Sequence, residues 1–210
     1  MFNFQNLYLF FIAALLLNLA PGNDMIYVAS RSVSQGVKAG IASAAGVFVG
    51  CFVHIFAAVF GLSIIISRSA YLFQLIKFAG AGYLIYLGVR SLLSKSAVDT
   101  KGENLSETGY WKLFRQGVAT NALNPKVAIF FLSFLPQFID PASHFFKFQL
   151  FILGTWFAAQ GTLVLIIVAF ILGKTKGFFR KNPKVWKVQG KVTGLILIGL
   201  GLKIALASKK

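Results

Sequence analysis

The sequence predicts an all-α integral membrane protein with six transmembrane helices, arranged as two inverted three-helix repeats, in which the first and fourth helices are broken at proline. Three observations lead to this prediction. Of the 210 residues, 57% are hydrophobic and only 12% are charged, whereas a soluble domain carries about 25% charged residues. Six apolar runs are long enough to cross a bilayer, and the last three repeat features of the first three.

The six apolar runs are close to the roughly 20 residues that a membrane-spanning helix needs. They cover residues 4–30, 39–66, 70–93, 116–139, 145–173 and 190–207, and the first and fourth are interrupted at Pro21 and Gly22 and at Pro125. The longest polar connections are 94–115 and 174–189. We therefore expect a single transmembrane domain over 1–210, with repeat one over 4–93, a cytoplasmic linker over 94–115 and repeat two over 116–207.

Lysine and arginine lie mostly between the apolar runs, as anchors at membrane interfaces do. The net charge of +16 therefore does not indicate a nucleic-acid-binding protein. Twelve of these residues lie in the first, third and fifth connections, and four lie at the C-terminus and in the second and fourth connections. By the positive-inside rule, the basic connections face the cytoplasm and both termini lie outside.

The two halves of the chain share a pattern. "NLAPGNDMIYVAS", residues 18–30, corresponds to "NALNPKVAIFFLS", residues 121–133, because each has an asparagine upstream of a proline inside an apolar run. "GYLIYLGVRSLLSK" in the third run likewise corresponds to "GLILIGLGLKIALASK" in the sixth. Each half has an odd number of spans, so the second copy must be inverted. Paired proline-interrupted spans indicate a transporter site near the middle of the bilayer, although a single proline is ordinary in a membrane helix.

Asp24 is the only carboxylate inside an apolar run. A charged side chain at the centre of a bilayer costs about 2.5–3.5 kcal/mol on insertion scales, so its position needs a reason. One hypothesis is that Asp24 couples transport to a proton or contacts a substrate. The alternative is that Asp24 caps the helix that restarts after Pro21 and Gly22, since Asp is a favoured N-cap residue. Both roles are compatible.

Asn124 and Pro125 are expected to start a new helix deep in the membrane, because Asn favours the N-cap and Pro the first helical position. Backbone N–H groups left free at that start would suit a substrate carboxylate. Lys126 follows directly. It either pairs with Asp24 across the interface between the repeats or extends to the cytoplasmic interface.

Other polar and small residues inside the runs are expected to have structural roles. Asn18 and Asn121, about one turn before the prolines, should satisfy carbonyl groups that the breaks leave free. Cys51 and His54 share one helix face, but zinc needs three or four ligands, so we expect no metal site and a buried, hydrogen-bonded histidine. The glycines that suit close helix packing are Gly40, Gly46, Gly50, Gly80, Gly82 and Gly88.

Three stretches carry a family pattern: "PGNDMIYVASRSVSQGVKAGIASAAGVFVG", "FAGAGYLIYLGVRSL" and "LNPKVAIFFLSFLPQFIDP". In this order and over nearly the whole chain, they resemble the lysine-exporter (LysE/RhtB) family of amino-acid translocators. The resemblance implies a small multi-pass protein of the cytoplasmic membrane that exports amino acids or close derivatives by proton antiport and is not an enzyme. The implied partners are the amino acid, the coupling proton and the lipid bilayer, with no cofactor.

The resemblance also implies which residues form the site. The broken-helix positions of the family correspond to Pro21, Gly22, Asp24, Asn124, Pro125 and Lys126. Members usually have Pro-Gly-Pro-Asp or Pro-Gly-Pro-Asn at the first break, and here Asn23 replaces the second proline. Relatives that carry reducing equivalents depend on a cysteine pair, and this chain has only Cys51.

The sequence disfavours two other functions. A metal or other cation exporter of the same fold is disfavoured by the single intramembrane carboxylate. An intramembrane enzyme such as a protease needs a nucleophile beside a base, but His54 and Ser63 are too far apart on one helix and no Gly-x-Ser-x-Gly motif is present. A homodimer stays open, because small exporters often pair and no run carries a strong interface motif.

Overall fold

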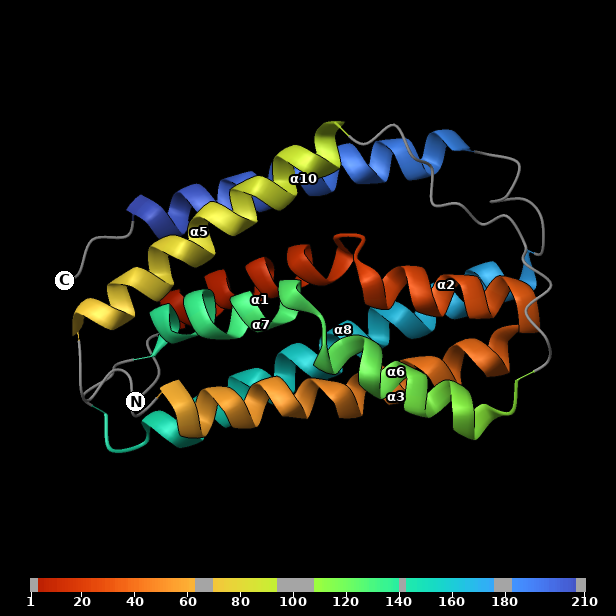
Figure 1. Cartoon of the computed structure of the whole chain (residues 1–210), viewed down its shortest axis with the longest axis horizontal. Coiled ribbons are helices and arrows are strands. Elements are labelled where there is room, and N and C mark those ends of the chain that lie inside the picture. The colour runs from red at the N-terminus through yellow and green to blue at the C-terminus, as the bar shows by residue number, and fades with distance from the viewer. Residues whose placement is uncertain (1–3, 63–69, 94–107, 140–142, 176–182, 207–210) are drawn as a thin grey trace.

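The computed structural model describes residues 4–62, 70–93, 108–139, 143–175 and 183–206, and every regular element among them is helical (Figure 1). The elements are α1 (Phe4–Leu19), α2 (Asn23–Gln35), α3 (Val37–Phe56), η1 (Ala57–Leu62), α5 (Ala70–Leu93), α6 (Tyr110–Ala122), α7 (Pro125–Ile129), η2 (Phe130–Phe134), η3 (Leu135–Phe138), α8 (Phe146–Lys174) and α10 (Pro183–Leu206). The prediction of an all-helical chain is confirmed for these residues.

Both expected helix breaks are present. Leu7–Leu19 and Asn23–Gln35 are bent by 50° relative to each other, and Tyr110–Ala122 and Pro125–Phe138 by 45°. Val37–Gly61, Gln74–Leu93 and Phe146–Lys174 are each long and apolar enough to cross a membrane. The described residues thus contain three such helices, or up to five spans if each bent pair is one span. The sixth expected span corresponds to α10, which this test does not include, so six spans stay a prediction.

Three helices extend beyond the predicted runs. The first run was expected to end at residue 30 and α2 continues to Gln35, while α6 begins at Tyr110 and α10 at Pro183 instead of at residues 116 and 190. Parts of both polar connections are therefore helical. The reason is that an apolar run marks only the stretch in hydrocarbon, while a helix can continue into the interface where its polar side chains reach water. The expected end of the second run at residue 66 and positions 94–107 of the linker lie outside the described residues.

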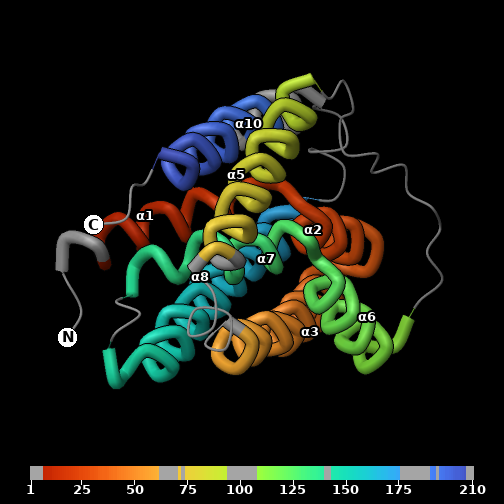
Figure 2. The backbone as a smooth tube through the Cα atoms, turned by 60° about the vertical axis from the view of Figure 1, so that its left-hand side comes forward, coloured from red at the N-terminus to blue at the C-terminus, as the bar shows by residue number. Residues whose placement is uncertain are grey.

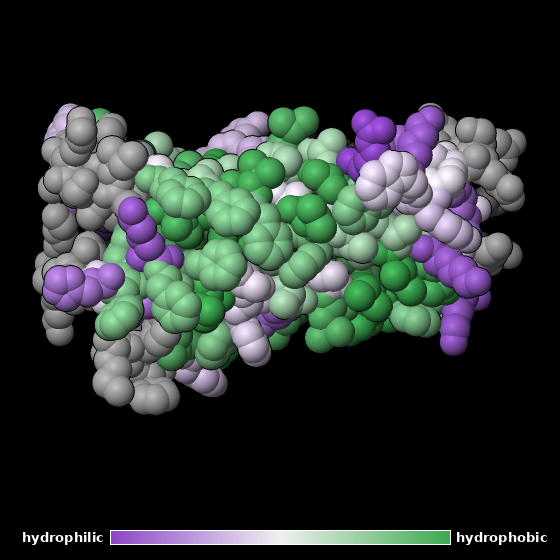
Figure 3. Space-filling model, turned by 90° about the horizontal axis from the view of Figure 1, so that it is seen from below, coloured by the Kyte–Doolittle hydropathy of each residue, from purple (hydrophilic) through white to green (hydrophobic). Residues whose placement is uncertain are grey.

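The molecule has an apolar middle. The face in Figure 3 is hydrophobic across its centre, with hydrophilic side chains towards both ends of the long axis. Large apolar side chains of the described helices are exposed, for example Val53, Phe56 and Phe60, of which Phe60 is 61% exposed. Such a surface is costly in water and suits lipid.

An aromatic core fills the end of the molecule where α1 begins. The rings of Phe130 and Phe157 stack with centroids 4.3 Å apart, and Phe131 meets Phe157 edge to face at 5.6 Å. Phe10 and Phe134, which are fully buried, belong to the same cluster. Because Phe130, Phe131 and Phe134 all belong to η2, this core fixes the segment that follows the second break.

Small residues set the distances between the main helices. α5 and α10 lie side by side along one side of the molecule in both ribbon views (Figures 1 and 2). A Cβ atom added at Gly88 of α5 would lie 2.7 Å from the carbonyl oxygen of Gly194 in α10. α3 meets α6 as closely, since a Cβ at Gly50 would lie 2.5 Å from the carbonyl oxygen of Val118. The role expected for the glycines holds for Gly40, Gly46, Gly50, Gly80 and Gly88 but is wrong for Gly82, which has open space around it.

We expect Gly46→Ala to destabilise the protein, because the new methyl group would overlap the backbone carbonyl of Phe114 in α6. Overpacking of this kind costs about 1–3 kcal/mol, which lowers the Tm by about 2–12 °C for a chain of this size. Thermal unfolding of the detergent-purified protein measures the effect. Gly82→Ala is the matched control and should not lower the Tm, because Gly82 lies in a helix with open space around it. Equal Tm values for the two variants would contradict close α3–α6 packing.

Candidate substrate site between two broken helices

The first break separates α1 from α2. Pro21 lacks the N–H that would continue the α1 hydrogen-bond ladder. Gly22 has an extended backbone, φ −158° and ψ −175°, which any residue can adopt. A glycine is needed for a different reason: a Cβ there would lie 3.0 Å from Nζ and 3.2 Å from Cε of Lys126. Gly22 therefore leaves the space through which the Lys126 side chain passes.

The second break separates α6 from α7. Asn124 is the N-cap of α7, since its Oδ1 accepts a hydrogen bond from the backbone N–H of Lys126 at 3.0 Å, and Pro125 occupies the start of the helix. The expectation that Asn124 and Pro125 start a helix is confirmed. The backbone N–H of Lys126, which was expected to be free to bind a carboxylate, is instead bonded to the cap residue Asn124. Pro125 has no N–H. The Lys126 N–H is therefore not one of the free donors that the sequence suggested for an anion at this helix start.

Asp24 lies in the first turn of α2 and is held by the second broken helix. Its Oδ2 accepts hydrogen bonds from Nδ2 of Asn121 at 2.9 Å and from Nδ2 of Asn124 at 2.8 Å. The alternative role as an N-cap is wrong, because Gly22 occupies the cap position of α2 and no side chain bonds there. The other oxygen, Oδ1, is buried and has no hydrogen-bond partner among the described residues, and the same is true of Oδ1 of Asn121.

Lys126 crosses in the opposite direction, from α7 to the end of α1. Its Nζ donates hydrogen bonds to the carbonyl oxygens of Leu17 at 3.2 Å and Ala20 at 2.9 Å. The Leu17 carbonyl lies in the last turn of α1 and also accepts a hydrogen bond from the backbone N–H of Ala20 at 3.1 Å, whereas Ala20 is the residue after the helix. A cation at this helix end also complements the helix dipole. The expectation that Lys126 extends to an interface is wrong, because its Nζ is bonded inside the protein. Its charge interacts with that of Asp24 across the two repeats, but its Nζ forms no hydrogen bond with either oxygen of Asp24.

Asn18 and Asn121 were expected to satisfy the carbonyl groups freed by the breaks, and this expectation is wrong. Nδ2 of Asn18 donates to the carbonyl oxygen of Phe157 at 3.2 Å and approaches Oε1 of Gln160 at 3.4 Å, so it links α1 to α8. Gly161 gives Asn18 its space, because a Cβ there would lie 2.7 Å from the asparagine Oδ1. The side chain of Asn121 serves Asp24 instead.

His54 is a part of this site that sequence reasoning did not assign to it. The ring is only 6% exposed and its Nε2 lies 2.8 Å from the carbonyl oxygen of Asn121. A carbonyl oxygen only accepts, so Nε2 carries the proton. The expectation of a buried, hydrogen-bonded histidine is confirmed. Its partner is 67 residues away in the chain, and the only signal in the sequence was a polar residue alone in an apolar run.

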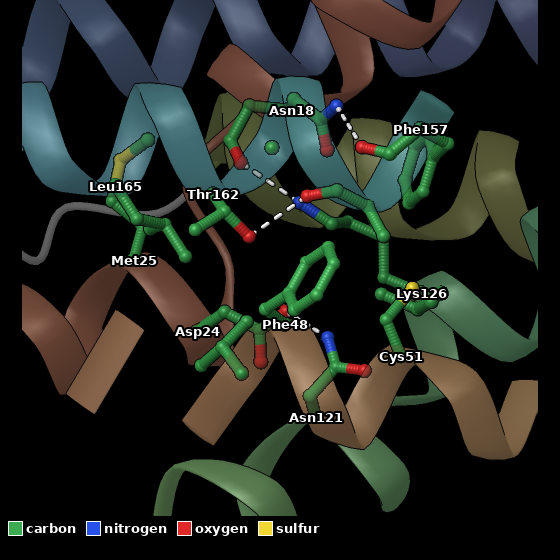
Figure 4. A pocket seen from close by; sticks show the side chains of 15 residues that line it. Asn18, Asp24, Met25, Phe48, Cys51, Asn121, Lys126, Phe157, Thr162 and Leu165 are labelled. Carbon is green, nitrogen blue, oxygen red and sulfur yellow. Dashed lines mark hydrogen bonds between the residues drawn. The ribbon is translucent and has the colours of Figure 1, made fainter. Parts of the chain in front are cut away.

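Asn18, Asp24, Asn121 and Lys126 border a small cavity between the two breaks (Figure 4). Its volume is about 30 Å³, which holds roughly two water molecules. Its polar lining comes from Asn18, Asp24, Asn121, Lys126 and Thr162. Within the described part of the chain, no group of three His, Cys, Asp or Glu side chains could hold a metal ion.

The structure is a bundle of apolar helices with two broken helices beside a cavity. The acid of the first broken helix, Asp24, bonds to the second, and the base of the second, Lys126, bonds to the first. Such an arrangement is typical of a membrane transporter. The sequence comparisons agree with this class. Residues 15–208 match the model of the LysE type translocator family, so the chain belongs to that family.

Several curated proteins are similar over almost their whole length. The uncharacterized membrane protein YrhP of Bacillus subtilis (strain 168) is 34% identical over 204 residues, which cover 93% of this chain and 96% of YrhP. Leucine efflux proteins of Salmonella choleraesuis (strain SC-B67) and Salmonella typhi are 29% identical over 202 residues, covering 95% of this chain and 94% of each of theirs. No solved structure matches the chain.

Proposed function

We propose that this protein exports amino acids across the cytoplasmic membrane in exchange for protons, and that the amino acid binds between the two broken helices. One observation carries the proposal: two buried acceptor oxygens, Oδ1 of Asp24 and Oδ1 of Asn121, have no partner among the described residues and belong to side chains that line the cavity. Buried acceptors normally have a donor. The ammonium group of an amino acid would supply donors to both.

The opposite side of the cavity suits the carboxylate of the same molecule. An ammonium group such as Nζ of Lys126 has three N–H donors. The carbonyls of Leu17 and Ala20 occupy two of them, so one is left for a carboxylate of the substrate. Asp24 and Lys126 then bind the two charged ends of a zwitterion, each held in place by the other repeat.

Proton exchange follows from the use of a single carboxylate for two ligands. Asp24 binds either the substrate ammonium or a proton, because protonation removes the charge that attracts the ammonium. The site can open to one side of the membrane or to the other. If it switches sides only when Asp24 has bound either the substrate ammonium or a proton, export of one amino acid is coupled to import of one proton. This assigns Asp24 the coupling role and Lys126 a substrate-binding role.

Transport also requires the cavity to open, since its present volume does not admit an amino acid. The site could open between α2 and α6, because the contacts that hold these two helices together there are polar. The hydroxyl of Tyr27 donates to the carbonyl oxygen of Leu113 at 2.6 Å, and Arg31 donates to Gln116 at 3.0 Å. Water can replace hydrogen bonds of this kind at little cost, so we assign this contact to the cytoplasmic entrance of the site.

The contacts between helices support two inverted three-helix repeats in one domain. The contact of α3 in repeat one with α6 in repeat two corresponds to the contact of α8 in repeat two with α1 in repeat one, and α5 pairs with α10. α1 begins and α10 ends at the same end of the molecule (Figure 1). The C-terminal ends of α2 and α8 and the N-terminal ends of α3 and α6 lie at the opposite end of the molecule (Figure 1), and these parts of the helices carry Arg31, Lys38, Lys112, Arg115 and Lys174. By the positive-inside rule we assign that end to the cytoplasm and both termini to the outside.

The test is transport by purified protein in proteoliposomes, with an imposed pH gradient and a panel of labelled amino acids. The expected result is movement of an amino acid against its concentration gradient, in the direction opposite to the proton flow and abolished by a protonophore. Protein-free liposomes are the control. Absence of flux for every amino acid in the panel would contradict the proposed function, and flux of a divalent metal in its place would favour a cation exporter.

A further inference from the structure

We infer that the exported amino acid has an uncharged, aliphatic side chain, which binds against an apolar wall formed by Val47, Phe48 and Cys51 of α3 and by Ala158 and Leu165 of α8. The inference rests on the proposed function, because it assumes that Asp24 and Lys126 bind the ammonium and carboxylate groups. It adds the class of side chain, which neither the family match nor the fold specifies.

The first step is a count of charges. Of the cavity-lining side chains that the structure describes, only Asp24 and Lys126 carry a charge. A zwitterion uses both of them, one for each of its charged ends. The ammonium of a lysine side chain, or the carboxylate of a glutamate side chain, would then be buried without an opposite charge. Burying an unpaired charge is strongly unfavourable, so the cavity disfavours amino acids with a charged side chain.

The second step is the chemistry of the wall. Val47, Cys51, Ala158 and Leu165 are all at least 95% buried and line the same cavity. Residues 47, 48 and 51 share one face of α3, and residues 158 and 165, seven apart, share one face of α8. The two helices therefore present a mostly apolar surface to the cavity, in which Thr162 is the polar side chain of α8.

The polar side chains on this side are already bonded within the protein. The hydroxyl of Thr162 donates to the carbonyl oxygen of Ala158 at 2.8 Å. The amide nitrogen of Asn18 donates to Phe157. Neither donor is therefore free to bind a polar substrate side chain, whereas an apolar side chain leaves both bonds intact. This favours an aliphatic substrate over a hydroxylated or amide-bearing one.

The third step concerns size. Phe48 is the largest side chain of the wall, and its ring is held edge to face against Phe52 at a centroid distance of 5.3 Å. Small residues on α8, Ala158 and Gly161, face the same cavity. A branched or linear aliphatic side chain fits between an aromatic ring and small residues once the cavity opens. The Phe48 ring excludes larger, aromatic side chains.

The primary test is the substrate panel of the wild-type protein, which does not depend on any variant folding. In proteoliposome exchange assays, leucine, isoleucine, valine and methionine should each be transported at least about tenfold faster than lysine, arginine or glutamate. Lysine or glutamate transported as fast as leucine would overturn the inference and leave the proposed function standing. Absence of transport for all amino acids would instead contradict the proposed function.

A substitution tests the wall directly. Phe48→Ala should raise the ratio of phenylalanine to leucine transport about tenfold, because it removes the ring that limits side-chain size. Phe56→Ala is the matched control, since Phe56 lies on the same helix, is 48% exposed and does not line the cavity. It should leave the ratio unchanged. A Phe48→Ala protein that transports leucine with an unchanged ratio would overturn the assignment of the wall.

Discussion

Replacing Asp24 with asparagine is expected to lower pH-driven amino-acid export about 100-fold. Truncating or neutralising one member of a buried charge pair costs about 2–5 kcal/mol, and two decades in rate correspond to about 2.7 kcal/mol. The variant should still fold, because the amide oxygen can accept the hydrogen bonds that Asn121 and Asn124 donate to Oδ2. What it loses is the charge that attracts the substrate ammonium, and the group that binds the proton.

The measurement compares proteoliposomes with and without a pH gradient. In the wild type the gradient should drive export, and in Asp24→Asn the small remaining flux should no longer respond to it. Asn23→Ala is the matched control, because Asn23 is the neighbouring residue of the same helical turn but is exposed. It should transport normally. Asp24→Asn protein with unchanged coupled export would show that Asp24 carries neither the proton nor the substrate.

Replacing Lys126 with methionine is expected to affect both folding and transport. The substitution keeps a long side chain but removes the Nζ donor from the carbonyl oxygen of Ala20 and one of the two donors from that of Leu17. Loss of charge-assisted hydrogen bonds to buried groups costs about 1.5–3 kcal/mol, which lowers the Tm by about 3–12 °C. Export should fall about 100-fold as well, because the substrate carboxylate loses its cation.

Two further variants separate these effects. Lys126→Arg keeps the charge and the donors, so it should restore most of the Tm even if the altered geometry lowers transport. Lys112→Met removes an exposed lysine of α6 and should change neither quantity. If Lys126→Met kept the Tm and the transport rate of the wild type, Lys126 would have no part in the site or in closing the end of α1.

Features that depend on a few neighbouring residues could be predicted from the sequence. The breaks near Pro21 and Pro125 follow from the missing proline N–H, and the cap made by Asn124 follows from a side chain that reaches its own helix start two residues on. The hydrophobic runs predicted most of each helix, because apolarity is also a property of neighbouring residues in the chain. They failed at the helix ends, where α2, α6 and α10 continue into polar sequence that apolarity does not detect.

The contacts of the site could not be predicted, because they join residues about one hundred positions apart. Asp24 is bonded to residues 97 and 100 positions away, and Lys126 to residues 109 and 106 positions away. From sequence, Asn18 was a reasonable partner for the carbonyls at the end of α1, since it lies on that helix. In the folded protein Lys126 reaches those carbonyls through the space left by Gly22, and Asn18 turns to α8.

The sequence by itself therefore determined that this is a helical membrane protein of the translocator family, with one intramembrane carboxylate and two helix breaks. These are properties of composition and of local backbone chemistry. Only the tertiary structure decided that the acid of the first broken helix is held by the second, and that the lysine of the second closes the end of the first. The reason is that a broken helix leaves donors and acceptors unpaired inside an apolar interior, and the side chain that satisfies them is selected by packing in space.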